Sequence, residues 1–152
     1  MICFNNMQRA LYLAAAALIA PAFAEKLPEP VGHVARVEGP AYVSSRGYTN
    51  AAKVGQAIVP GVALSTGAKG RLGVILDDGS VLSFGPHSEF TLDEFRFAPA
   101  AGDLQLRAML ARGSLNLIAG DMARLDPDAV AIDTPQGLVR VLGGQLLMKV
   151  NE

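Results

Sequence analysis

Short alternations of apolar and polar residues run through most of the chain after residue 31. Residues 72–76 place Leu, Val and Leu at every second position, and residues 104–110 repeat the pattern with Leu, Leu, Ala and Leu. A period of two is typical of a strand with one buried face. Similar runs occur at residues 82–84, 90–92, 115–119, 130–132, 139–141 and 146–150. Long stretches with a helical period are missing, so the pattern predicts an all-β fold.

Glycine marks the ends of these runs. Asp78-Gly79 predicts a tight hairpin with a positive φ at Gly79. We expect Gly85-Pro86 and Gly113 to end neighbouring strands. Residues 104–111 contain good helix formers, but their alternation favours a strand. The strand spacing is compatible with a single domain built as a sandwich, a barrel or a stacked coil, and residues 98–103 are the most loop-like stretch.

The first 24 residues have the pattern of a secretory signal peptide. A basic residue, Arg9, precedes an apolar run over residues 10–20, and Ala22-Phe23-Ala24 provides the small side chains that signal peptidase requires. We therefore expect cleavage between Ala24 and Glu25, no retained membrane segment, and a periplasmic or secreted protein; Met7 offers an alternative start. An extended leader is predicted for residues 25–31, and the β domain for residues 32–150.

Composition narrows the function further. The one cysteine, Cys3, lies in the signal segment, so no disulfide is expected in the mature chain. Charges nearly balance and Trp is absent, which gives no electrostatic or stacking signature for nucleic acid. We expect no nucleic-acid partner and no cofactor.

Candidate catalytic groups are scattered. A hydrolase would need His87 beside an acid and a nucleophile, but there is no G-x-S-x-G motif. His33 and His87 are too few and too far apart for a predicted zinc site. Asp77-Asp78 is more simply a turn than an acid pair, and Gly67–Arg71 is more simply a basic turn than a phosphate loop. We therefore expect no catalytic or metal-binding residues.

Four acidic residues form a loose set that matches no calcium loop. They are Asp121, Asp126, Asp128 and Asp133. Asp126-Pro127-Asp128 is typical of a turn.

The order of several short motifs resembles the FecR-domain family of periplasmic proteins. The motifs are Val31–Val43 with Gly39, Leu64-Ser65-Thr66-Gly67, Asp78-Gly79-Ser80 followed by Gly85-Pro86-His87-Ser88, Arg112-Gly113-Ser114-Leu115, and Thr134-Pro135. Together they extend over residues 31–150. The resemblance implies a β-solenoid-like roll and a sensing or scaffolding role. The strand spacing leaves a β-sandwich as the alternative fold.

The chain departs from the family plan in two respects. We expect a stand-alone form without anti-sigma or membrane segments. In addition, Leu142-Gly143-Gly144 stands where the family usually has R-G-T, so only Gly143 carries that signature.

The resemblance favours a non-enzymatic protein-interaction domain in envelope signalling, whose partner is another envelope protein. The predicted interaction edge is the last strand, with Leu146, Leu147, Met148 and Val150. Two alternatives remain open. One is a glycan-binding module of the envelope, for which Tyr42, Tyr48 and Phe97 are the candidate rings. The other is a small hydrolase using His87.

Overall fold

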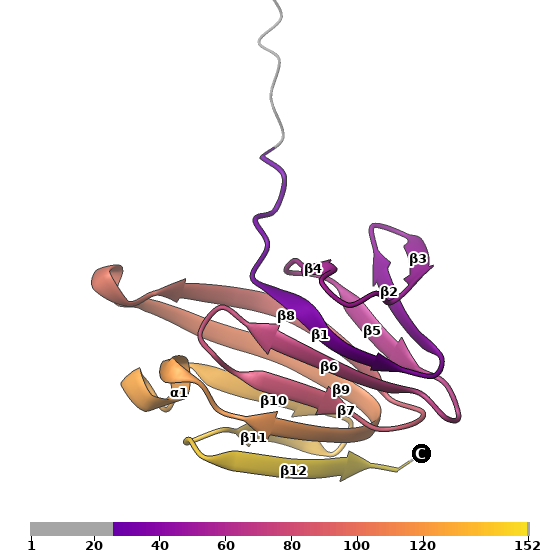
Figure 1. Ribbon diagram of the computed structural model, residues 1–152. Helices are drawn as coiled ribbons and strands as arrows, with labels where there is room; N and C mark the ends of the chain where they lie inside the picture. The colour runs from indigo at the N-terminus through magenta and orange to yellow at the C-terminus, as the bar shows by residue number, and fades with distance from the viewer. Residues whose placement is uncertain (1–25, 152) are drawn as a thin grey trace, which may run out of the picture.

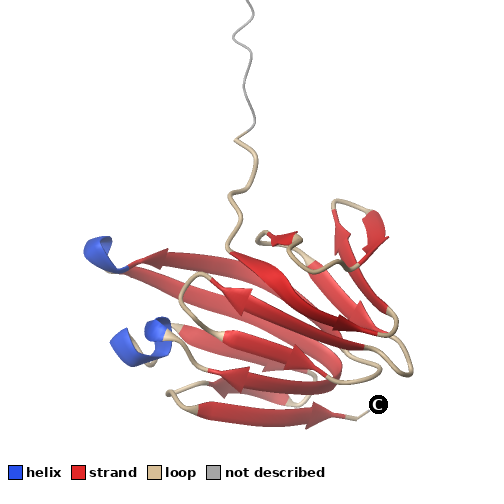
Figure 2. Ribbon diagram, in the orientation of Figure 1, coloured by secondary structure: helices blue, strands red, loops and turns tan. Residues whose placement is uncertain are grey.

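The computed structural model describes residues 26–151, so the expected signal peptide and its cleavage site lie outside the described residues. The described chain forms twelve strands, a short α-helix and a 3₁₀ turn (Figures 1 and 2). The elements are β1 (Gly32–Glu38), β2 (Ala41–Ser45), β3 (Tyr48–Ala51), β4 (Ala57–Ile58), β5 (Ala63–Thr66), β6 (Arg71–Leu76), β7 (Val81–Phe84), β8 (Glu89–Ala98), η1 (Pro99–Ala101), β9 (Asp103–Ile118), α1 (Asp121–Leu125), β10 (Val130–Thr134), β11 (Gly137–Arg140) and β12 (Gln145–Val150).

All twelve strands belong to one sheet that curls on itself (Figure 1). Its main path runs β3-β2-β5-β8-β9-β7-β6-β1-β4. Two further branches start at β9: β10 pairs with it in parallel and carries β11, and β12 pairs with it antiparallel. The other strand pairs are antiparallel.

Strand β9 joins the two halves of the curled sheet. Its first part pairs with β8 and β10, and its second part pairs with β7 and β12. Gly113 lies between the two parts with a φ of 93°. The prediction that Gly113 ends a strand is therefore wrong. A residue without a side chain can adopt this backbone conformation, so the strand continues through it.

The core lies between the facing halves of the sheet. Apolar residues that alternate along each strand point inward; Val74 and Ala108, from opposite halves, are fully buried. The rings of Phe84 on β7 and Phe90 on β8 have centroids 4.9 Å apart across this core. The all-β prediction is thus confirmed. A single curled sheet describes the architecture better than a solenoid of stacked coils.

Local predictions meet the structure in several places. Residues 104–111 form part of β9, as their alternation predicted, and not a helix. Asp78-Gly79 closes the hairpin between β6 and β7, with a φ of 84° at Gly79. Helix α1 was not predicted from the sequence. It buries Met122 and Ala123 against the core and so closes one end of the curl.

The leader has no regular secondary structure over residues 26–31. Its last residue joins the sheet, since Val31 N donates to Ile58 O at 2.7 Å and Asp77 N donates to Val31 O at 2.8 Å. Within residues 26–151, no helix has the length and apolar character needed to cross a membrane.

Candidate functional site

Three of the family motifs meet at one end of the curl, around a buried hydroxyl. Ser88 is 1% exposed, and its Oγ donates to Gly85 O at 2.8 Å and accepts from Ser114 N at 3.1 Å. Thr66 Oγ1 donates to the same Gly85 O at 2.7 Å and accepts from Ser88 N at 2.9 Å. A side chain at Gly113 would overlap Ser88. These residues therefore hold β5, the β7–β8 turn and β9 together.

The first family turn packs against this cluster. Gly67 N donates to Pro40 O at 2.9 Å, and Gly67 O accepts from His87 N at 3.1 Å. A side chain at Gly39 would overlap Lys69 O. The predicted basic turn at 67–71 is present: Gly70 N donates to Gly67 O at 3.0 Å and β6 follows. One packed corner of the fold therefore contains Gly39, Thr66, Gly67 and Gly113.

A second buried cluster of hydrogen bonds forms at the β6–β7 hairpin. Asp78 and Ser80 are 2% and 3% exposed. The Asp78 carboxylate accepts from Ser80 N at 3.0 Å and from Ser80 Oγ at 2.7 Å, and Ser80 Oγ accepts from Gly120 N at 3.0 Å. Asp121 N donates to Asp78 O at 2.8 Å. These hydrogen bonds hold the start of α1 against the hairpin. The Asp78 carboxylate is bound by Ser80 within the same motif.

The remaining signature residues shape the last two loops. Thr134 Oγ1 donates to Gly137 O at 2.8 Å and accepts from Gln136 N at 3.3 Å, which closes the turn that holds Pro135. Gly143 lies in the loop between β11 and β12 with a φ of 125°. These contacts give the signature turns a structural role.

The structure does not assemble the expected catalytic candidates. His33 is exposed on β1, and His87 is exposed in the β7–β8 turn with a φ of 54°. Asp77 is exposed whereas Asp78 is buried, so the two carboxyl groups do not face a common space. Among residues 26–151, no group of three or more His, Cys, Asp or Glu side chains could hold a metal ion.

The four acidic residues singled out in the sequence each make a separate local contact. Asp121 lies 3.5 Å from Arg124, Asp128 lies 2.9 Å from Arg140, and Asp133 lies 3.3 Å from Arg107. Asp126 Oδ1 accepts from Asp128 N at 3.0 Å, as expected for the predicted turn. Each carboxylate therefore has its own partner within the chain.

The candidate aromatic rings do not form one platform. Tyr48 pairs with Ser45 across β2 and β3, whereas Tyr42 pairs with Ala51. Cross-strand partners share a face and successive residues alternate, so Tyr42 and Tyr48 lie on opposite faces. Phe97 is partly buried on β8. This arrangement does not favour sugar stacking.

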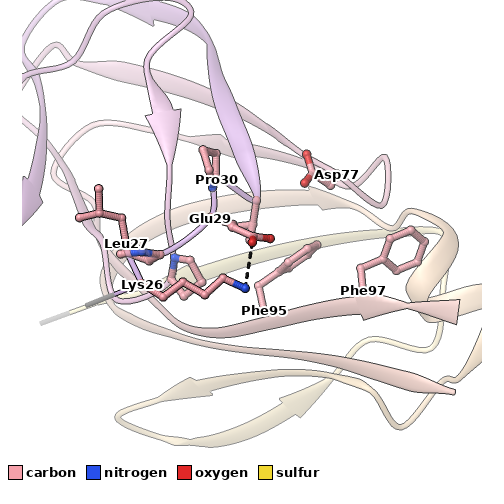
Figure 3. Close-up of a pocket in the computed structure, with 10 residues that line it drawn as sticks. Lys26, Leu27, Glu29, Pro30, Asp77, Phe95 and Phe97 are labelled. Carbon is pink, nitrogen blue, oxygen red and sulfur yellow. Dashed lines mark ion pairs between the residues drawn. The ribbon is translucent and has the colours of Figure 1, made fainter. Parts of the chain in front are cut away.

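The leader borders a hollow of about 410 Å³ at the end of β8 (Figure 3). Phe95 and Phe97 line it together with Asp77, and Lys26 pairs with Glu29 at 3.1 Å. Glu29 and Lys26 are largely exposed. The hollow combines an apolar wall with charges of both signs.

Strand β12 is an open edge. It pairs with β9 and with no other described strand. Leu146 and Met148 are half-buried and Val150 is buried, whereas Leu147 is 73% exposed. Leu147 therefore faces outward, as its position in the alternation predicted.

The register shows which backbone groups this edge exposes. Ala119 N donates to Gly144 O at 2.8 Å, and Ile118 pairs with Gln145. Hydrogen-bonded and non-hydrogen-bonded pairs alternate in an antiparallel ladder. Leu146, Met148 and Val150 are accordingly bonded to β9. Gln145, Leu147 and Lys149 direct their N–H and C=O groups away from it.

The two outer faces of the sheet differ in where their charged residues lie. The face formed by β8, the first part of β9, β10 and β11 carries ion pairs such as Arg112–Glu89 at 2.6 Å and Arg107–Asp133 at 3.3 Å. On the other face, a cross-strand row begins at Arg36 on β1 and continues with four uncharged residues, Gly73, Ser83, Asn116 and Leu147. Ile118, 46% exposed, lies in the adjacent row. This second face adjoins the open edge of β12.

Comparison with known proteins identifies the family. The sequence profile described as FecR protein matches residues 62–152, more than half of the chain. The match includes the L-x-T-G, D-G-S and T-P motifs and the β12 edge, and it starts after the first motif at Val31–Val43. No curated protein and no solved structure matches the chain. On the strength of this match, the chain belongs to the FecR protein family.

Proposed function

We propose that this protein is a non-enzymatic protein-interaction domain of the cell envelope that acts as a sensor or scaffold. Family membership relates the domain to envelope signalling. The observation that supports an interaction role is the open edge of β12. Three of its six residues direct their backbone groups outward, and one of the three, Leu147, also exposes its side chain.

A partner strand would add to this edge. Main-chain hydrogen bonds to Gln145, Leu147 and Lys149 would give affinity, and the alternate side chains would give specificity. Long apolar edges are ordinarily blocked by charge, proline or a covering loop. Lys149 is the one charged residue on β12, so the edge is only lightly protected.

Export is part of the proposal. Residues 1–24 have the features of a cleaved signal, and the partner would be another exported protein. N-terminal sequencing of protein from fractionated cells should give Glu25 as the first residue in the soluble envelope fraction. An intact N-terminus in the membrane fraction would refute export by cleavage.

A proline variant tests the edge. Leu147→Pro removes one outward donor and leaves the β9 ladder in place. Leu138→Pro is the matched control, because Val141 N bonds to Val130 O and Leu138 therefore also faces outward, from the edge of β11. We expect crosslinking pull-downs from envelope extract to lose partners with folded Leu147→Pro and to keep them with Leu138→Pro. Equal recovery with both variants would refute the edge model.

A further inference from the structure

A groove lies on the outer face beside β12. Its volume is about 560 Å³, and it runs over β7 and the second part of β9. Leu147 and Pro86 form apolar walls. Ser83, Ser114 and Asn116 form a floor of small polar side chains, two of which are hydroxyls with no hydrogen bond to a described residue. A side chain at Gly85 would overlap Ser114 Oγ, so the glycine keeps this part of the floor low.

Two cations border the groove from opposite sides. Arg71 projects from β6 and Lys149 from β12, and both are exposed. Neither has an ion pair with any residue in the described part of the chain. Glu38 lies opposite Arg71 in the ladder, but its carboxylate accepts from Arg36 Nε at 2.9 Å. Among residues 26–151, no acidic side chain therefore forms an ion pair with either of these two positive charges.

A second hollow adjoins the groove, and its lining also carries positive charge. It shares Pro86, Ser114 and Lys149 with the groove and adds His87 and Arg112. Arg112 contacts Glu89 at 2.6 Å, but no acidic residue within the described range 26–151 lines either hollow. By contrast, the hollows at the leader and at β10–β11 contain both signs. The chain as a whole carries a formal charge of −1, so this corner is a local basic patch.

From this charge pattern we infer that the groove receives a segment of the partner protein that carries a carboxylate next to an apolar side chain. The carboxylate lies between Arg71 and Lys149 and accepts from the floor hydroxyls. The apolar side chain packs on Leu147. This inference rests on the proposed interaction function and specifies the chemistry of the partner. The apolar wall beside an open strand edge favours a peptide over a carboxylated polysaccharide.

Selection from a random peptide library displayed on phage tests the inference. The bait is the folded domain, and the variant is the double charge reversal Arg71→Glu with Lys149→Glu. Arg46→Glu with Lys53→Glu changes the net charge equally at exposed sites outside both hollows. Thermal melts establish that both double variants are folded.

We expect the selected peptides to combine acidic and apolar residues. Their affinity should fall about tenfold or more in Arg71→Glu/Lys149→Glu, stay unchanged in the control, and weaken with salt. Selected peptides without a carboxylate, or equal binding to both double variants, would overturn the inference while leaving the edge model untouched. Binding of alginate with no peptide selected would also overturn it. A selected peptide that binds Leu147→Pro as tightly as the wild type would overturn the packing of its apolar side chain on Leu147 and would also speak against the edge.

Discussion

Ser88 occupies the space that a side chain at Gly113 would need. Its Oγ accepts from Ser114 N at 3.1 Å, directly after the point where β9 passes Gly113. The strand can pass so closely because residue 113 has no Cβ and adopts a φ of 93°. This contact joins the two halves of the curled sheet at the corner where three family motifs meet.

Gly113→Ala should therefore be strongly destabilising. We expect a loss of about 2 kcal/mol or more in the free energy of unfolding, because the change adds a steric overlap to an unfavourable φ. Gly102→Ala is the matched control: its φ is 68°, but a Cβ there would meet nothing within 4 Å. Urea denaturation compares the two. If Gly113→Ala costs no more than Gly102→Ala, the close contact with Ser88 is not important for stability.

Ser80→Ala tests the second buried hydrogen-bond cluster, at the β6–β7 hairpin. The change removes a hydrogen bond to the Asp78 carboxylate and leaves Gly120 N without its acceptor. An unsatisfied buried polar group costs about 1–3 kcal/mol, and we expect a loss of this size in denaturant melts. Ser83→Ala, on an exposed serine of the next strand, should change stability little. Similar small losses of stability in both variants would mean that this hydrogen-bond cluster contributes little to the free energy of unfolding.

Amide hydrogen exchange checks the register of β12. Leu146 and Met148 should exchange slowly because their N–H groups bond to β9, whereas Leu147 and Lys149 should exchange fast. Two-dimensional NMR in deuterated buffer resolves these amides. The reverse alternation would mean that β12 presents different backbone groups at its open edge.

Much of the fold follows from local pattern. Period-two alternation located β6, β7 and most later strands, and Asp78-Gly79 gave the correct hairpin and φ. The five-residue helix α1 was missed because it is too short to show a 3.6-residue period. Gly113 was misjudged because a glycine that ends a strand and one that lets a strand pass a neighbour look alike in sequence.

The polar interior was also hidden from sequence reasoning. The sequence placed Asp78, Ser80 and Ser88 in turns and did not predict their burial, yet all three are buried within hydrogen-bond networks. The family motifs marked these positions without giving the reason for them. The basic groove depends on Arg71 and Lys149, which are far apart in sequence and meet only through the order β6-β7-β9-β12.

Photocrosslinking from single positions tests the interaction role most directly. A benzoylphenylalanine replaces Leu147 in one variant and Met109 in another; Met109 is 41% exposed on the outer face of the other half of the sheet. On irradiation of intact cells, we predict discrete adducts with one envelope protein from position 147 and none from position 109. Adducts from position 109 alone, or the absence of adducts from position 147 in a folded and expressed variant, would contradict the account.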